Sequence, residues 1–251
     1  MKLRIFGSSS KGNGYAIQAQ DGKVLLLEAG VPAAELLRIY NPDQIEGCLI
    51  SHEHGDHMGR IKDYLQKGIK CVINDSTSQK VIQSLDQYKW STKMINPKKM
   101  LAEGLGKFTF KPFELFHDVP CSGFLILHDE LKMPLLFATD TDHIPYTFTD
   151  AGTVMIEADY GERKMQENEQ SGHLHPGLAR RIRESHMSLE KTIKFIKAQT
   201  DISKVERIIL IHLSESNSDQ KEFRDTMQEA TGIITYIATP GMEIEIGKNR
   251  F

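Results

Sequence analysis

The chain of 251 residues contains 39% hydrophobic and 26% charged side chains, which is ordinary for a soluble globular protein. This length favours a single domain over residues 1–251, and no apolar run approaches the roughly 20 residues that a membrane-spanning helix needs. The formal net charge of −3 provides no general attraction to nucleic acid, so a polyanion could bind only at a local basic patch or a metal centre.

The N-terminal segment and the cysteines favour the cytoplasm. The sequence MKLRIFGSSSKG reaches a glycine-serine turn too early for the apolar region of a signal peptide. Cys48, Cys71 and Cys121 are odd in number and form no CxxC pair, which argues against a disulfide framework and a zinc knuckle. We therefore expect a cytoplasmic protein in which Cys48 and Cys71 are small core residues.

The first third of the chain predicts strands interspersed with helices. Strands are expected over residues 3–6, 15–20, 23–30, 45–51 and 70–74, and helices over 32–40, 58–68 and 75–85. Pro32 fits the start of the first helix, and Gly68 fits the end of the second. Asp75 or Ser76 is expected to cap the third helix.

The rest of the chain is again rich in strands. Strands are expected over residues 107–117, 121–128, 133–140, 152–159, 205–214, 233–239 and 242–246, and helices over 189–199 and 219–232. Residues 160–188 form a polar stretch to which no element is assigned. The order strand-rich, helix, strand-rich, helix, with many hairpins, predicts an α/β fold with sheets covered by helices in a layered sandwich.

The sequence SHEHGDHMG concentrates potential metal ligands directly after the apolar run CLI, at the expected C-terminal end of a strand. His52 and His54 lie two apart and can hold one ion, whereas the adjacent Asp56 and His57 suit a second. Nitrogen and carboxylate ligands favour Zn²⁺, with Mn²⁺ or Fe²⁺ also compatible. Glu53, between two ligands, is expected to point outward or to support the site rather than to act as a base.

Three more candidate ligands end apolar runs: His117 ends FELFH, Asp140 ends LLFATD, and His212 ends IILIH. A single histidine at a strand end is more often structural than a ligand. Together with the HxHxDH sequence, however, these three residues predict one joint site. Asp118 and Asp142, each close to one of them in sequence, are candidates for orienting the imidazoles.

The HxHxDH loop, followed by a histidine, an aspartate and a histidine on later strands, resembles the metallo-β-lactamase superfamily. The resemblance implies an αββα sandwich of two mixed sheets flanked by helices. It also implies two divalent metal ions, Zn²⁺ favoured and Mn²⁺ possible, that share a nucleophilic hydroxide. By the same resemblance, the first ion is held by His52, His54 and His117, the second by Asp56, His57 and His212, and both by Asp140. Asp56 is also counted among the catalytic residues.

The segment GSSSKGNG, residues 7–14, resembles the opening loop of the WalJ-type (YycJ-type) branch of this superfamily. It is not a nucleotide-binding P-loop, because Asn13 stands where the lysine would be. Two interpretations remain open: a glycine-rich hairpin turn, or a loop that contacts substrate through Ser9 and Asn13.

The segment LARRIRESHMS resembles a basic stretch that leads into a GHxS motif in the same branch, with Ser185 in place of the glycine. His186 matches the motif histidine, which implies contact with the scissile phosphate and proton transfer to the leaving group. The structural alternative is that His186 only precedes a helix capped by Ser188. The arginines of this segment form a local basic cluster in which Arg181 is a candidate phosphate ligand; they are Arg180, Arg181 and Arg183.

These features predict a binuclear metal-dependent phosphodiesterase that acts on nucleic acid, with DNA favoured and cleavage from the 5′ end. One alternative is an enzyme of the same fold that opens a cyclic nucleotide or cyclic phosphate. Another is a protein that keeps the fold but only binds, against which the complete ligand set argues. No membrane partner is expected, and the sequence leaves the oligomeric state open.

Overall fold

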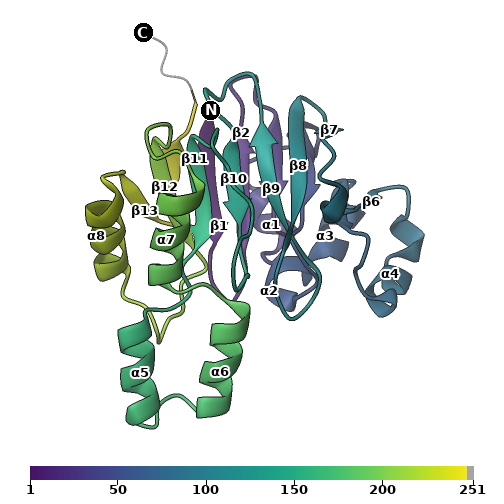
Figure 1. Ribbon diagram of the computed structural model, residues 1–251. Coiled ribbons are helices and arrows are strands. Elements are labelled where there is room, and N and C mark those ends of the chain that lie inside the picture. Colours follow the sequence, from purple (N-terminus) through teal and green to yellow (C-terminus); the bar gives the residue numbers. More distant parts are fainter. Residues whose placement is uncertain (248–251) are drawn as a thin grey trace.

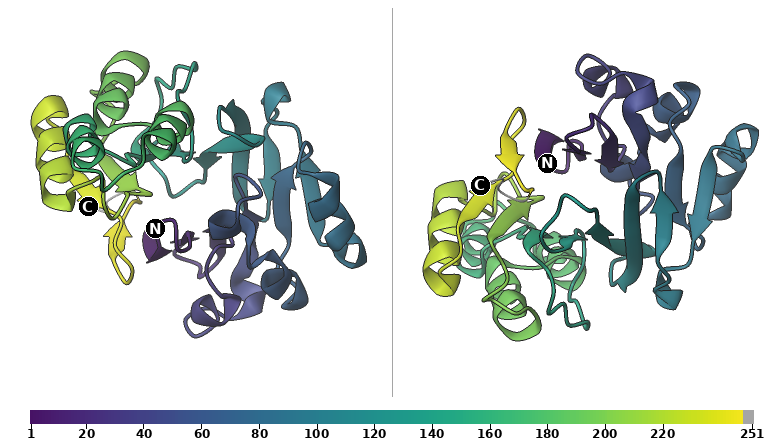
Figure 2. Two further views of the ribbon diagram at one scale, coloured as in Figure 1. Left: turned by 90° about the horizontal axis from the view of Figure 1, so that it is seen from below. Right: turned by 90° about the horizontal axis from the view of Figure 1, so that it is seen from above.

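A computed structural model describes residues 1–247 of the chain. Two seven-stranded mixed sheets face each other, and helices cover their outer faces (Figures 1 and 2). The predicted αββα sandwich is confirmed. Within the described residues, no helix is both long and apolar enough to cross a membrane.

The first sheet is formed mainly by the N-terminal part of the chain. Its spatial order is β14-β1-β2-β3-β4-β5-β6. The strands are β1 (Lys2–Gly7), β2 (Gly14–Gln18), β3 (Val24–Leu27), β4 (Ile45–Leu49), β5 (Cys71–Asn74), β6 (Thr92–Ile95) and β14 (Glu243–Glu245). β3 to β6 run parallel to one another, so the C-terminal ends of β3 and β4 lie at the same edge.

The second sheet has the order β13-β12-β11-β10-β9-β8-β7. Its strands are β7 (Glu103–Leu105), β8 (Phe108–Leu115), β9 (Cys121–Leu127), β10 (Leu135–Ala138), β11 (Thr153–Glu157), β12 (Arg207–Ile211) and β13 (Thr235–Ile237). β10 to β13 are parallel, which brings the residues that follow β10, β11 and β12 to one edge.

Alternate residues of the central strands belong to different cores. Leu25 and Leu27 of β3 pack between the sheets with Phe137 of β10, whereas Leu26 faces the outer helices. Burial on both faces explains why the central strands read as continuous apolar runs instead of alternating with polar residues. One core cluster is therefore shared by both sheets.

The helices of the first half are shorter than predicted. α1 covers only Ala33–Leu36 and continues as turns, and the expected helix over 58–68 is divided into α2 (Gly55–Met58) and α3 (Ile61–Gln66). The division occurs because the backbone N–H of Arg60 donates to the carbonyl of Ala29 (2.8 Å). Gly68 ends this region in a left-handed conformation, as predicted (φ 78°).

The prediction that Asp75 or Ser76 caps a helix is wrong. The backbone N–H of Ser76 donates to the side chain of Asn74 (2.8 Å), which makes this segment a turn. α4 (Gln79–Ser84) begins only after Ser78.

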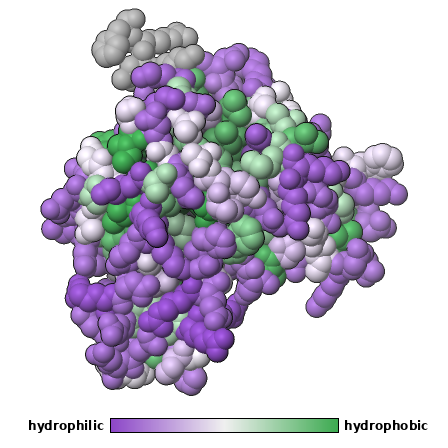
Figure 3. Space-filling view, viewed as in Figure 1, coloured by the Kyte–Doolittle hydropathy of each residue, from purple (hydrophilic) through white to green (hydrophobic). Residues whose placement is uncertain are grey.

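The polar stretch 160–188 contains two helices, α5 (Glu162–Gln170) and α6 (Pro176–Ser185), which form a hairpin that projects beyond the sandwich (Figure 1). Its visible surface is mainly hydrophilic (Figure 3). A small cluster that includes Tyr160, Met165 and Ala179 holds the hairpin together. The predicted helices of the last third are present as α7 (Leu189–Gln199) and α8 (Gln220–Thr231).

Candidate metal centre

The HxHxDH sequence spans the end of the loop after β4 and the first residues of α2. His52 is buried in this loop, three residues after the end of β4, and His54 is the N-cap residue of α2. Asp56 and His57 lie within α2, so the helix separates this pair from the two preceding histidines. The loop therefore presents two groups of ligands at one edge of the sandwich.

The first group consists of His52, His54, His117 and Asp140, whose ligand atoms all lie within 4.8 Å of one another. The Nδ1 atoms of His52 and His117 are engaged by the hydroxyl of Ser51 and the carbonyl of Ser185, both at 2.9 Å. Their Nε2 atoms are thereby oriented toward the site. The Nε2 atom of His117 lies 3.2 Å from Nδ1 of His54.

The second group consists of Asp56, His57, Asp140 and His212. The Oδ2 atom of Asp56 lies 3.2 Å from Nε2 of both His57 and His212. The Oδ2 atom of Asp140 lies 3.3 Å from Nε2 of His57. Asp140 is thus common to both groups.

These residues fit two metal ions. Ligand atoms at about 2.0–2.1 Å from a tetrahedral zinc ion are roughly 3.3 Å apart, close to the separations observed here. Nε2 of His52, the nitrogen that faces the first group, is buried without a hydrogen-bond partner, although unpaired buried nitrogens are costly. The predicted ligands therefore form clusters consistent with a binuclear site.

The charge states suit metal binding. Burial, followed by the neighbouring His57, holds the pKa of His52 well below its usual value, which favours the neutral imidazole that can bind an ion. Burial of Asp140 opposes ionisation, but His212 and His57 outweigh it and hold the pKa of this carboxyl well below its usual value. Asp140 is therefore ionised.

Three residues of the centre have a left-handed backbone: Glu28, Asp140 and His212, with φ of 66°, 48° and 54°. Each follows a central strand. Non-glycine residues rarely adopt this conformation, and they do so most often at functional sites.

Two buried glutamates that the sequence analysis did not identify support the ligands. The carboxylate of Glu28 lies 3.6 Å from Nδ1 of His57. Glu157 accepts hydrogen bonds from the backbone N–H groups of Asp140 (2.9 Å), Thr141 and Met187 (both 2.8 Å). Both glutamates end apolar runs, VLLLE and TVMIE, so the criterion that selected Asp140 and His212 could have found them.

His186 lies beside both groups of ligands. Its ring stacks on that of His212 (5.6 Å between centroids, 6° between planes) and meets the ring of His117 edge-on at 5.1 Å. Nδ1 is 3.1 Å from the carboxylate of Glu157. Burial opposes protonation, but Glu157 outweighs it and raises the pKa of His186 to about 10. Since Nδ1 is engaged, Nε2 is the nitrogen that remains for an external group.

The loop over residues 7–14 supports the second group of ligands from behind. The buried side chain of Asn13 contacts Oδ2 of Asp56 (3.3 Å) and Nε2 of His57 (3.1 Å). The hydroxyl of Ser8 accepts a hydrogen bond from the backbone N–H of His212 (3.0 Å). This placement of Asn13 favours positioning of the ligands over substrate contact.

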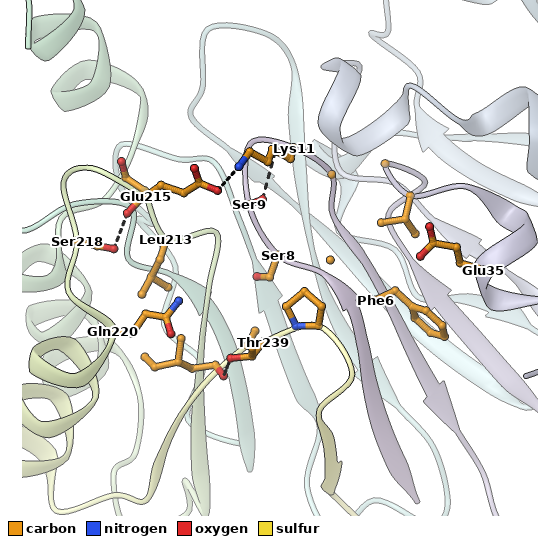
Figure 4. Close-up of a pocket in the computed structure, with 18 of the residues that line it drawn as sticks. Phe6, Ser8, Ser9, Lys11, Glu35, Leu213, Glu215, Ser218, Gln220 and Thr239 are labelled. Carbon is orange, nitrogen blue, oxygen red and sulfur yellow. Dashed lines mark hydrogen bonds and ion pairs between the residues drawn. The ribbon is translucent and has the colours of Figure 1, made fainter.

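A cavity of about 560 Å³ lies on the outer side of this loop (Figure 4). An ion pair between Lys11 and Glu215 (2.6 Å) crosses it and joins the loop to the segment after β12. Ser9 lines the cavity, where its hydroxyl accepts a hydrogen bond from the backbone N–H of Lys11 (3.2 Å).

Comparisons with known proteins agree with this geometry. The family described as "Beta-lactamase superfamily domain" matches residues 26–213. The chain belongs to the metallo-β-lactamase superfamily. Membership and the His/Asp clusters make it a metal-binding hydrolase of that superfamily.

Individual members of the superfamily are similar over nearly the whole chain. Exodeoxyribonuclease WalJ of Streptococcus pneumoniae, strains D39 and R6, is 24% identical over 242 residues, which cover 90% of this chain and 86% of WalJ. The metallo-β-lactamase fold protein YhfI from Bacillus subtilis has a TM-score of 0.71 at 17% identity, covering 97% of this chain and 98% of YhfI. Human tRNase Z, short form, has a TM-score of 0.64 at 14% identity, and the match covers 99% of this chain and 100% of tRNase Z. These two structural likenesses show the fold alone.

Near the metal centre, the three arginines of the basic segment differ in the partners that their side chains contact. Arg180 pairs with Glu184 (2.8 Å), and Arg183 pairs with Glu169 and Glu162, so both are matched within the α5–α6 hairpin. Arg181 instead reaches Asp118 at the metal centre (2.8 Å). Arg181 alone of the three lies at the rim of the site.

The other acidic residues that the sequence singled out near the metal centre differ in their contacts. Oδ1 of Asp118 lies 3.3 Å from Nε2 of His54, whose Nδ1 faces the first group, so Asp118 is close enough to orient this ring; it also lies 3.1 Å from Nε2 of His117. Asp142 instead pairs with Lys191 and His143. Glu53 turns away and accepts a hydrogen bond from the backbone N–H of Ser78 (2.6 Å).

Proposed function

We propose that the protein is a two-metal phosphodiesterase that cleaves DNA from the 5′ end. The placement of His186 carries the proposal. Its Nδ1 is engaged by Glu157 at the junction of the two ligand groups, and Nε2 is left for a phosphate oxygen. Similarity to an exodeoxyribonuclease over 90% of the chain supports DNA as the substrate.

Each group of side chains has a distinct task in this proposal. His52, His54 and His117 would hold one ion, Asp56, His57 and His212 the other, and Asp140 both. When bound, two divalent ions supply a nucleophile at neutral pH and neutralise the charge that develops on the phosphoryl oxygens. His186 would donate a proton from Nε2 to a phosphate or leaving-group oxygen. Glu157 fixes the ring by holding Nδ1.

Arg181 is the proposed contact for the substrate backbone. It is 65% exposed at its side chain and is attached to the centre only through Asp118. Its planar guanidinium could bind a neighbouring phosphate while still close to the metal ligands. Because Arg180 and Arg183 are matched by glutamates, we expect them to contribute little.

A second candidate is hydrolysis of a small cyclic nucleotide or cyclic phosphate. The observation in its favour is the low positive charge around the centre: the chain has a net charge of −3, and two of the three nearby arginines are paired with glutamates within their own hairpin. A substrate with one phosphate needs fewer basic contacts than a DNA strand does.

One experiment separates the two candidates. Protein loaded with Zn²⁺ or Mn²⁺ is incubated with 5′-labelled single- and double-stranded DNA and with cyclic mononucleotides across a salt series. The nuclease proposal expects short products from DNA and a rate that falls as salt rises. Rapid opening of a cyclic nucleotide that is insensitive to salt, with intact DNA, would instead establish the small-molecule phosphodiesterase. His186→Ala is the control for contaminating nucleases.

A further inference from the structure

Phe116 is an aromatic residue at the rim of the metal centre with no role so far. It follows the last residue of β8 and directly precedes the ligand His117. It is 38% exposed, and it is the only exposed phenylalanine among residues 1–247. An exposed ring next to a ligand calls for an explanation, because this chain buries its other described phenylalanines fully or partly.

The position of Phe116 is fixed by its neighbours. Its backbone N–H donates to the hydroxyl of Thr141 (2.9 Å), and its carbonyl accepts from the N–H of Asp142 (2.8 Å). The ring stacks on His143, with 4.5 Å between centroids and 17° between planes. The backbone of Phe116 is thus held and its ring is stacked on a second ring, which limits the conformational entropy lost when a ligand stacks on it.

Phe116 also lines a cavity whose wall includes one of the proposed ligands, His117. The cavity has a volume of about 470 Å³, and its wall includes Phe116, His117, Asp118, Asn74 and Lys98. This volume falls in the range of small-molecule sites. His143 is not part of this wall and lines a different cavity, so its stacking on Phe116 does not close the cavity next to His117.

We propose that Phe116 stacks on the nucleobase adjacent to the scissile phosphate and that this cavity is the base subsite. The inference rests on the proposed function and names the part of the substrate that the metal ions do not hold. Every base presents a flat π-face, so stacking on an aromatic side chain positions a strand without reading its sequence. His117 and Phe116 belong to the wall of the same cavity, so a nucleotide whose phosphate lies near His117 can place its base against Phe116.

Binding of two small probes to the zinc-loaded protein tests the subsite directly. The probes are deoxyadenosine monophosphate and deoxyribose 5-phosphate, which differ by the base. We expect the wild type to prefer the nucleotide roughly 5- to 100-fold, the range for stacking one base on an aromatic side chain. Phe116→Ala should remove this preference and leave the affinity for the sugar phosphate unchanged, whereas Phe116→Trp should retain it.

Leu127→Ala is the matched control, because Leu127 is also 38% exposed but does not line the cavity. This variant should keep the full preference for the nucleotide. A wild type without preference, or equal weakening of both probes in Phe116→Ala, would overturn the inference.

DNA cleavage by the wild type is measured separately. A protein that cuts no DNA but binds the nucleotide through Phe116 would refute the nuclease proposal and support the base subsite. Cleavage of DNA by the wild type, with no effect of Phe116→Ala on the preference for the nucleotide, would support the nuclease proposal and refute the base subsite.

Discussion

Replacing Glu157 with glutamine tests whether this buried carboxylate organises the metal centre. Glu157 is completely buried and accepts three backbone hydrogen bonds, two at Oε1 from Thr141 and Met187 and one at Oε2 from Asp140. Oε2 also holds Nδ1 of His186. A single side chain thus links the loop of the shared ligand to the proposed catalytic histidine.

The expected cost follows from these bonds. In Glu157→Gln, the amide oxygen can replace Oε1 and keep the bonds from Thr141 and Met187, but the NH₂ group then faces the N–H of Asp140. One buried donor without an acceptor costs roughly 1–3 kcal/mol. A protein of this size loses about 2–4 °C in melting temperature per kcal/mol, so Tm should fall by roughly 2–12 °C.

Turnover should fall by roughly tenfold or more, because neither His186 nor the Asp140 loop is held as before. The assay combines thermal unfolding, phosphodiesterase turnover and metal content. Glu103→Gln, at an exposed ion pair with Lys93, is the control and should change none of them. A Glu157→Gln variant with wild-type Tm and turnover would refute the positioning role.

Three further predictions concern the ligands and the substrate contacts. The purified protein should contain about two equivalents of transition metal by elemental analysis. Asp140→Ala should lower this content and abolish most activity, because both ligand groups use Asp140. An Asp140→Ala variant with full metal content and full activity would contradict a bridging role of Asp140. His186→Ala should lower turnover roughly a hundredfold at unchanged metal content, which is the usual effect of losing a general acid. Metal loss in this variant would indicate a structural role of His186 instead. Arg181→Ala should flatten the salt dependence of DNA binding by about one phosphate contact. Arg180→Ala should not, because the side chain of Arg180 is paired with Glu184. Equal effects of the two substitutions on the salt dependence would argue against a specific phosphate contact by Arg181.

The clustering of these His and Asp side chains could be predicted because their sequence signals are local. HxHxDH places four of them within six residues, and His117, Asp140 and His212 each interrupt or end an apolar run. Parallel strands then bring such run ends to one edge, which is a property of the sheet rather than of any one residue. Glu28 and Glu157 carry the same signal, but a carboxylate after a strand does not reveal whether it faces an ion or the backbone.

The polar hairpin was missed because its composition is mainly polar. α5 buries only Met165, and α6 buries only Ala179 and Ser185, so the short apolar stripe of α6 over Leu178, Ala179 and Ile182 is easily overlooked in a polar segment. The pairing of the arginines is only partly visible in sequence. Arg180 and Glu184 are four residues apart, whereas Arg183 and Glu169 meet only because the two helices fold back on each other.

The left-handed residues show which part of the molecule imposes the geometry of the centre. Glu28, Asp140 and His212 each carry a backbone strain of roughly 1–3 kcal/mol, and each comes shortly after a strand whose residues are buried between the sheets or under the helices. A strand that simply continued would send the next side chain to the opposite face, away from the ligands. The strain can persist because the paired strands and their packing fix the preceding backbone. The fold therefore holds these side chains in position before any ion binds, which is the condition for a preorganised metal site.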